Sequence, residues 1–292
     1  MMANCFDILS VQTKRGLVLK GAIFNSDNTD TVAVILTGIC SNLFQNELLY
    51  TTGKGLSNNG ITCIVGHAHD SFSCFAYTDA SIGKQVHTGV FNDNFDMVYE
   101  DVETYVKYAK EVMKAKKIVL IGHSLGSNKI INYLGNTPDD FVDYFIVSSP
   151  VDVMHFLRVM PDVDKCYELS KQWVEEGRGG DLLPHLFGGF SPMTAQTVLD
   201  FFNAENLKNC PVLSKEGEIK SLYNIKPRGA FVIGSKDSVT GDSPKEFMEQ
   251  LNNWTNSPND NKVVVIDGAS HIYYNMHNEY AEVVLGLIRG IG

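Results

Sequence analysis

A five-residue turn between an apolar run and a helix-forming run constrains this chain more than any other feature. Residues 117–121 read Lys-Ile-Val-Leu-Ile, residues 122–126 read Gly-His-Ser-Leu-Gly, and residues 127–134 favour a helix. In the Gly-x-Ser-x-Gly pattern, glycines flank the serine because the sharp bend from strand to helix crowds the backbone. The pattern therefore predicts that Ser124 stands at the end of a strand, with its hydroxyl available as a nucleophile.

Apolar, β-branched runs alternate with helix-compatible segments along most of the sequence. The predicted strands are 17–24, 31–36, 61–65, 118–121, 141–147, 230–233 and 263–266. The predicted helices are 45–56, 95–113, 127–134, 244–251 and 275–288. Such alternation predicts an α/β fold, in which a mostly parallel sheet carries helices on both faces.

The alternation stops between residues 151 and 222, where short helical patterns and prolines replace the buried strands. A stretch of this length inside an α/β chain favours an inserted helical cap over a structureless loop. We therefore predict a core of residues 1–150 and 223–292 and a cap of residues 151–222, inserted after the sixth strand. The cap residues suited to lining a substrate pocket are Trp173, His185, Phe187 and Phe190. The alternative is that they form the cap's own core.

A serine hydroxyl is a weak nucleophile at neutral pH, so it needs a base and an acid that orients the base. Asp237 follows the predicted strand 230–233, and His271 follows the predicted strand 263–266. The order serine, acid, histidine is the one expected when the acid and the base lie on loops after later strands. Asp152, which follows the strand ending at Val147, is the alternative acid.

The segments Gly-His-Ser-Leu-Gly, Gly-Ser-Lys-Asp and Gly-Ala-Ser-His resemble the three catalytic segments of the α/β-hydrolase superfamily. The placement of the inserted segment is similar to that of the caps of monoacylglycerol lipases and of cinnamoyl or feruloyl esterases. The resemblance implies an α/β-hydrolase fold and an oxyanion hole formed by the backbone N–H groups of Ile39 and Leu125. Thr37 departs from the family's His-Gly-x turn, so the local support of this loop differs.

Together these residues predict two-step acyl transfer on a small-molecule carboxylic ester, with a small acyl or aryl group and no metal or organic cofactor. His271 would take the proton of Ser124, and Asp237 would hold the imidazole tautomer. A thioester or a carbon–carbon bond is an alternative substrate for the same triad. A binding protein that kept the fold without catalysis is an alternative of another class.

The pair His67 and His69, followed by Asp70, raises the possibility of a metal site, because alternation along an extended chain would direct both histidines to one side. No second cluster of potential ligands of similar density occurs in the sequence. The same loop of the α/β-hydrolases carries a Gly-His-rich turn near the pocket. We therefore expect these residues to have structural or pocket-wall roles.

Composition argues against several other classes. A net charge of −10 disfavours nucleic-acid binding, which requires a basic surface. No stretch approaches the uninterrupted apolar length of a membrane span, and the first residues lack the pattern of a secretory signal. The six cysteines include no C-x-x-C pair, which favours free thiols in a reducing compartment. The sequence therefore predicts a cytoplasmic protein and leaves its oligomeric state open.

Overall fold

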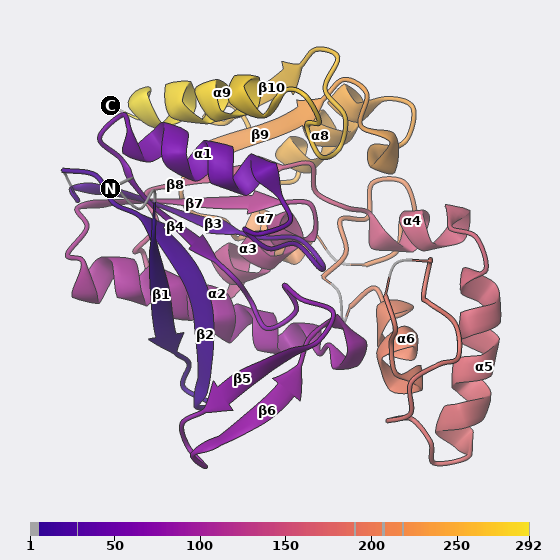
Figure 1. The fold of residues 1–292 in the computed structure, drawn as a ribbon. Coiled ribbons are helices and arrows are strands. Elements are labelled where there is room, and N and C mark those ends of the chain that lie inside the picture. The colour runs from indigo at the N-terminus through magenta and orange to yellow at the C-terminus, as the bar shows by residue number, and fades with distance from the viewer. Residues whose placement is uncertain (1–5, 28, 190, 206–207, 218, 292) are drawn as a thin grey trace.

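The computed structural model describes residues 6–27, 29–189, 191–205, 208–217 and 219–291. They form one ten-stranded sheet flanked by helices (Figure 1). The strands are β1 (Asp7–Gln12), β2 (Leu17–Phe24), β3 (Thr31–Leu36), β4 (Thr62–Gly66), β5 (Phe75–Asp79), β6 (Lys84–Thr88), β7 (Lys117–His123), β8 (Tyr144–Ser148), β9 (Gly229–Gly234) and β10 (Lys262–Ile266).

The sheet is parallel in its centre and antiparallel at one edge. The strand order is β10-β9-β8-β7-β3-β4-β2-β5-β6, with β1 paired to β2. Neighbouring strands from β10 to β4 run parallel, whereas β2 pairs antiparallel with β1, β4 and β5. The predicted mostly parallel sheet is thus confirmed. Its central strands read as continuous apolar runs because both faces of a parallel sheet are covered.

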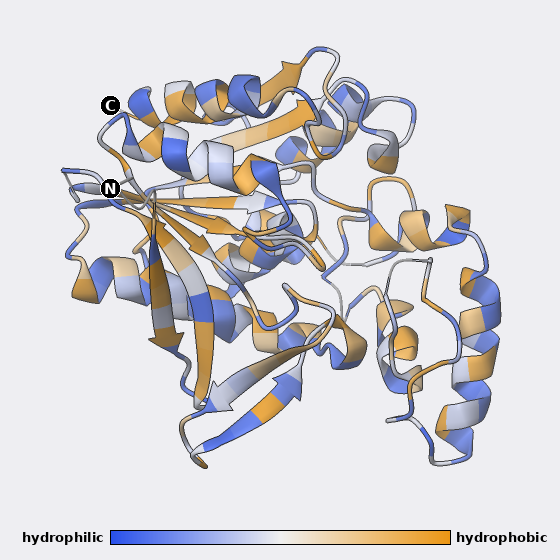
Figure 2. Cartoon of the chain, viewed as in Figure 1, coloured by the Kyte–Doolittle hydropathy of each residue, from blue (hydrophilic) through white to orange (hydrophobic). Residues whose placement is uncertain are grey.

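Helices cover both faces of the sheet. They are α1 (Glu47–Ser57), α2 (Val98–Lys107), α3 (Leu125–Asn136), α8 (Pro244–Asn253) and α9 (His277–Arg289). Successive side chains of β7 point to opposite faces: Ile118 and Leu120 pack in the same core as α2, α3 and α8, whereas Val119 and Ile121 pack with α1 and α9. Figure 2 shows the hydrophobic residues along the central strands and the mixed character of the surrounding helices.

Three strands, β1, β5 and β6, were not predicted from the sequence. Few of their residues are fully buried, so their sequences lack a continuous apolar run: Leu9 and Val11 are buried in β1, Tyr77 is buried in β5, and no residue of β6 is buried. The predicted helix 95–113 is divided into a 3-10 turn (Phe95–Met97), α2 and a π-helical turn (Tyr108–Val112). Further 3-10 turns are Val90–Asn92 and Ser238–Thr240.

The segment between β8 and β9 is helical in the part that the structure describes. It contains α4 (Val153–Val159), α5 (Val163–Glu175), α6 (Ala195–Phe201) and α7 (Lys220–Tyr223). Figure 1 shows α4, α5 and α6 beside one end of the sheet. In this chain the segment follows the eighth strand and not the sixth, because β1, β5 and β6 add three strands to the five that were predicted before residue 151.

A single asparagine on α3 holds this segment at its start and again at Lys208, before α7. The Asn128 amide donates to the Val151 carbonyl (2.9 Å) and to the Lys208 carbonyl (3.3 Å), and its side-chain oxygen accepts from the Val151 N–H (3.1 Å). Asn128 is fully buried, so these backbone groups have exchanged water for a side-chain partner. The segment therefore leaves the core and returns to it next to α3.

The helices and the cysteines of the described residues bear on two of the expectations from composition. No helix among them has the length and apolar character that crossing a membrane requires. The cysteines among them are all free: Cys40, Cys63, Cys74, Cys166 and Cys210.

Candidate active site

Ser124 stands at the junction of β7 and α3 in a strained backbone conformation. Its φ of 56° and ψ of −132° are unusual for a residue with a side chain. The glycines on either side allow the sharp bend. A Cβ added at Gly126 would lie 2.3 Å from the carbonyl oxygen of Leu36, and one at Gly122 would lie 2.5 Å from the carbonyl oxygen of Gly126. Larger residues at these positions would therefore push β7, α3 and the loop after β3 apart.

Ser124 is the first member of a chain of hydrogen bonds. Its Oγ lies 3.0 Å from Nε2 of His271, and Nδ1 of His271 lies 3.1 and 3.0 Å from the two carboxylate oxygens of Asp237. Asp237 is 1 % exposed, whereas the His271 side chain keeps 18 % of its surface accessible. Burial acts to raise the pKa of the Asp237 carboxyl, but hydrogen bonds from His271 and Ser149 more than offset it, so the pKa is lowered.

The three residues come together because they follow parallel strands that end at the same edge of the sheet. The loops after β9 and β10 are also bonded to each other, since the Ser235 N–H donates to the Ile266 carbonyl (2.9 Å) and the Lys236 N–H donates to the Ala269 carbonyl (2.9 Å). These bonds fix the separation between the loop of Asp237 and the loop of His271.

His123, the residue before Ser124, anchors the loop of His271 from the other side. Its Nε2–H donates to the His271 carbonyl oxygen at 2.8 Å. Burial and the neighbouring His271 lower the pKa of His123 to about 4, which keeps its ring neutral at ordinary pH. His123 therefore ties the turn around Ser124 to the backbone of His271, the residue that contacts the Ser124 hydroxyl.

The structure gives Asp152, the alternative acid, a different set of partners. Asp152 is the N-cap of α4, and its carboxylate accepts hydrogen bonds from the Asn209 amide (2.9 Å) and from the backbone N–H groups of Leu213 and Ser214 (2.8 Å each). All of these partners belong to the segment between β8 and β9. The carboxylate bonded to His271 is that of Asp237.

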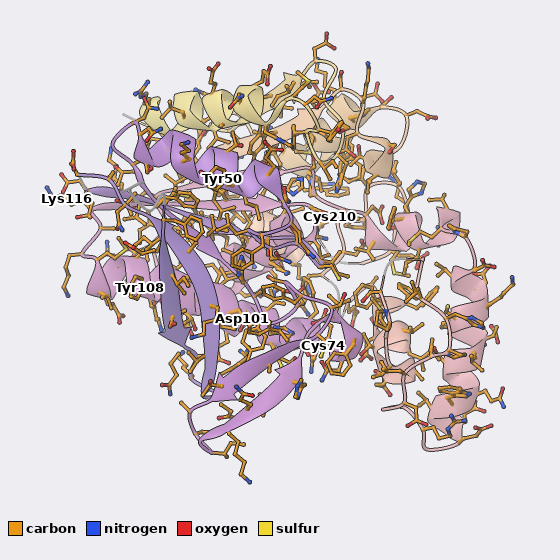
Figure 3. The ribbon with its side chains drawn as sticks, in the orientation of Figure 1. Tyr50, Cys74, Asp101, Tyr108, Lys116 and Cys210 are labelled. Atoms are coloured by element: carbon orange, nitrogen blue, oxygen red, sulfur yellow. The ribbon has the colours of Figure 1, made fainter. Side chains whose placement is uncertain are left out.

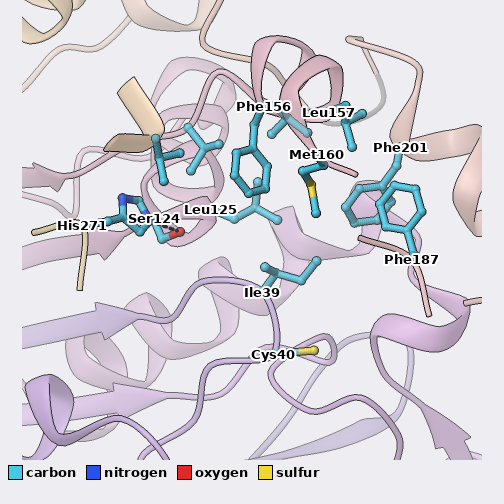
Figure 4. Close-up of a pocket in the computed structure, with 13 residues that line it drawn as sticks. Ile39, Cys40, Ser124, Leu125, Phe156, Leu157, Met160, Phe187, Phe201 and His271 are labelled. Atoms are coloured by element: carbon cyan, nitrogen blue, oxygen red, sulfur yellow. Dashed lines mark hydrogen bonds between the residues drawn. The ribbon is translucent and has the colours of Figure 1, made fainter. Parts of the chain in front are cut away.

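Ser124 and His271 border an apolar cavity of about 340 Å³, shown in Figure 4. The predicted oxyanion residues Ile39 and Leu125 both line it, beside Ser124. The remaining lining residues are Cys40, Val151, Val153, Phe156, Leu157, Met160, Phe187, Phe201 and Val239. In Figure 4 the cavity extends from Ser124 and His271 toward the rings of Phe187 and Phe201, which meet edge to face with centroids 5.7 Å apart.

A model of the family described as "Protein of unknown function (DUF1749)" matches residues 87–288. The chain belongs to the DUF1749 family. No curated protein matches its sequence.

Solved structures identify the fold. Est1E from Butyrivibrio proteoclasticus is 14% identical, with 97% of this chain and 98% of that chain covered and a TM-score of 0.64. The siderophore hydrolase EstB from Aspergillus fumigatus is 14% identical, with 100% and 99% covered and a TM-score of 0.69. The alpha/beta hydrolase GrgF from Penicillium sp. sh18 is 15% identical, with 97% and 96% covered and a TM-score of 0.65. The predicted α/β-hydrolase fold is confirmed.

Only part of the predicted pocket lining agrees with the cavity of this DUF1749 member. Phe187 lines it, but Trp173 and His185 do not. Trp173 is half-buried beneath Arg178, whose guanidinium carbon lies 3.9 Å from the ring centroid, and His185 is exposed. Phe190 lies outside the described residues. The aromatic content of a segment does not determine which side of each helix faces the core.

The contribution of α4 and of the residue that follows it was not predicted: Phe156 and Leu157 on α4, and Met160 directly after it, line the cavity. The signal available in the sequence was their spacing, since residues three and four positions apart share one face of a helix. The contribution of Phe201 on α6 was missed as well. Both helices are short, so their periodicity alone does not show which face is covered.

His67 and His69 are both buried and contact different partners. Nε2 of His67 accepts from the Leu43 N–H (3.0 Å), and burial lowers the pKa of His67 to about 4. His69 lies between two carboxylates, with Nδ1 2.7 Å from Asp101 and Nε2 2.8 Å from Asp93. Asp101 on α2, labelled in Figure 3, also pairs with Arg15. Among the described residues, no His, Cys, Asp and Glu side chains are grouped as a metal site would require.

Proposed function

We propose that this protein is a serine hydrolase that cleaves a small-molecule carboxylic ester through an acyl-enzyme on Ser124. The observation that carries the proposal is the hydrogen-bonded chain from Ser124 through His271 to Asp237, which borders an apolar cavity. The likeness in fold to structures titled as esterases and hydrolases supports the same reaction class.

In the proposed mechanism, the Ser124 hydroxyl attacks the ester carbonyl while Nε2 of His271 takes its proton. The Asp237 carboxylate keeps the Nδ1–H of His271 in place and stabilises the imidazolium that forms. The backbone N–H groups of Ile39 and Leu125 donate to the oxyanion of the tetrahedral intermediate. The alcohol leaves with the proton from His271, and water then releases the acid by the reverse sequence of proton transfers. The mechanism needs no metal or organic cofactor.

We propose that residues 151–222 act as a cap over a core formed by residues 1–150 and 223–292. The supporting observation is that this stretch supplies Phe156 and Leu157 on α4, Met160 directly after α4, and Phe201 on α6 to the cavity wall. Among the described residues that line the cavity, Cys40 has the only polar or thiol side chain besides Ser124 and His271. Such a wall favours a neutral, apolar acyl group, because a charged or strongly hydrogen-bonding group would be buried there without partners.

The test combines active-site labelling with turnover of a substrate panel. A fluorophosphonate probe should label the wild type and fail to label Ser124→Ala, because the probe reacts with an activated serine. The matched control is Ser170→Ala, whose hydroxyl donates to the Cys166 carbonyl (2.7 Å) within α5, and it should be labelled like the wild type. A folded wild type that is neither labelled nor active on esters, thioesters or β-diketones would contradict the enzymatic function. Turnover restricted to thioesters or diketones would contradict the ester assignment alone.

A further inference from the structure

A lysine and an aspartate form an ion pair inside the core directly behind the loop that follows β3. Nζ of Lys129, on α3, lies 2.5 Å from a carboxylate oxygen of Asp70, and both side chains are fully buried. Removing two charges from water is costly, so a buried pair of this kind is weak evidence for stability. The pair therefore calls for another explanation.

Lys129 also contacts the backbone of the loop that contains Ile39. Its ammonium donates a second hydrogen bond, of 3.1 Å, to the carbonyl oxygen of Thr37. Lys129 belongs to the helix whose first residue is Leu125. One side chain thus links the helix that carries one proposed oxyanion donor to the loop that carries the other.

Asp70 and Ser71 bind the loop of residues 37–40 at two further points. The Asp70 carbonyl oxygen accepts from the N–H of Cys40 (3.2 Å), the residue after Ile39. The hydroxyl of Ser71 is hydrogen-bonded to the hydroxyl of Thr37 (2.8 Å). Residues 37 and 40 are therefore both fixed to the loop after β4, and Ile39 lies between these two anchors.

The loop is also packed tightly against Ser124. A Cβ added at Gly38 would lie 3.0 Å from the Ser124 Cβ and 3.2 Å from the His123 carbonyl oxygen. A small displacement of residues 37–40 would therefore change the position of the Ile39 N–H relative to the serine. Oxyanion stabilisation depends on donors held in place before the reaction begins.

We propose that Lys129 and Asp70 are positioning residues for oxyanion stabilisation, holding the loop of residues 37–40 so that the Ile39 N–H faces the reacting carbonyl. The inference rests on the proposed function. It also gives a physical role to two sequence features that the triad leaves unexplained: the threonine at position 37 and the acidic residue that follows His69.

The test compares Lys129→Met, Asp70→Asn and the double variant, using the full chain and a p-nitrophenyl ester. Met keeps the length and apolar stem of the lysine, and the double variant leaves neither charge unpaired. We expect kcat to fall by about 100-fold with KM changed by less than about threefold, since loss of one oxyanion donor lowers kcat by about 10²–10³. Inhibition by a trifluoromethyl ketone, which forms an oxyanion on the serine, should weaken by a similar factor, while binding of the corresponding methyl ketone should not.

Asp93→Asn is the matched control. Asp93 is also buried, and it is the partner of His69, but its hydrogen bond goes to the His69 ring and not to residues 37–40. This variant should lose stability and keep kcat within about threefold of the wild type.

The outcomes separate the two proposals. If the wild type hydrolyses the ester and the folded variants keep kcat within about threefold, the positioning role is refuted and the hydrolase function stands. If the single variants fail to fold, the kcat of the double variant is compared with that of the wild type instead, and a value within about threefold again refutes the positioning role. A wild type with neither turnover nor labelling at Ser124 would refute both proposals.

Discussion

Replacing Asp237 by asparagine should reverse the polarity of the hydrogen bond to His271. One carboxylate oxygen, Oδ1, accepts from the Val239 N–H at 3.0 Å, so the asparagine oxygen must remain at that position. Its NH₂ group then replaces Oδ2, 3.0 Å from Nδ1 of His271. An NH₂ group donates, so the shorter contact now favours Nδ1 as an acceptor and the ring proton on Nε2, against the single oxygen, Oδ1, that remains 3.1 Å from Nδ1. Nε2 would then donate to Ser124 and could no longer act as its base.

We expect kcat of Asp237→Asn to fall by about 10⁴-fold, the effect of a wrong histidine tautomer in a serine triad. This corresponds to about 5 kcal/mol of transition-state stabilisation. The loss should be in kcat with little change in KM, because the cavity wall is unaltered. The side-chain volume and the bond from Val239 are retained, so the variant should still fold.

The assay is hydrolysis of a p-nitrophenyl ester at several pH values, with folding followed by circular dichroism. Asp152→Asn is the matched control, because that carboxylate is also buried and hydrogen-bonded but contacts Asn209, Leu213 and Ser214. It should lower the free energy of unfolding by about 1–3 kcal/mol and leave the chemical step largely intact. A folded Asp237→Asn enzyme with more than a tenth of the wild-type kcat would refute the tautomer argument.

Three further predictions concern the cavity, the turn and the buried charges. Phe201→Ala should shift kcat/KM toward p-nitrophenyl esters with longer acyl chains, because Phe201 lies at the end of the cavity far from Ser124; an unchanged preference would place the acyl group elsewhere. Gly126→Ala should prevent folding or displace Ser124, since its Cβ would lie 2.3 Å from the Leu36 carbonyl oxygen, and circular dichroism with fluorophosphonate labelling would detect either. Although burial acts to lower the pKa of His69, Asp101 and Asp93 raise it to about 10. The stability from the protonated ring is fully present below about pH 6.5 and is lost as the pH rises toward 10, at up to about 1.4 kcal/mol per pH unit. The free energy of unfolding, measured with denaturant between about pH 6.5 and pH 10, should fall less for His69→Gln than for the wild type. An equal fall in both proteins would refute the assignment to His69.

The sheet and its covering helices were predictable because their signals are local. Buried parallel strands have continuous apolar runs, and the turn around Ser124 requires glycines at fixed positions. The positions of Asp237 and His271 followed from the order of strands, and the structure brings both side chains to Ser124.

The antiparallel edge and the cavity wall were less predictable. The strands of the β5–β6 hairpin contain a single buried residue, Tyr77, so no apolar run identifies them. The faces of α4 and α6 depend on how the segment folds over the sheet. Tertiary packing determines this arrangement, so composition placed Trp173 and His185 in a cavity that they do not line.

The pairing of Lys129 with Asp70 had no sequence signal of its own. A lysine within a helix is ordinarily read as solvent-exposed, and the two residues are 59 positions apart. Their meeting depends on the order of β3, β4 and β7, which brings the loop after β4 and the start of α3 to the same edge of the sheet.

The anchoring of residues 151 and 208 by Asn128 has an evolutionary consequence. Because the chain departs and returns beside one side chain, the length of the intervening stretch is largely uncoupled from the sheet. Doubling a flexible loop whose ends are already close adds only about 0.6 kcal/mol to its closure. Insertions at the exposed turns of this stretch therefore add little to the cost of closing it, whereas its buried residues, such as Leu157 and Phe201, pack in the same core as β7 and must be retained or replaced by residues that fill the same space. Descendants of one ancestral chain can acquire new cavity shapes while the strand ends that carry Ser124, Asp237 and His271 remain in place.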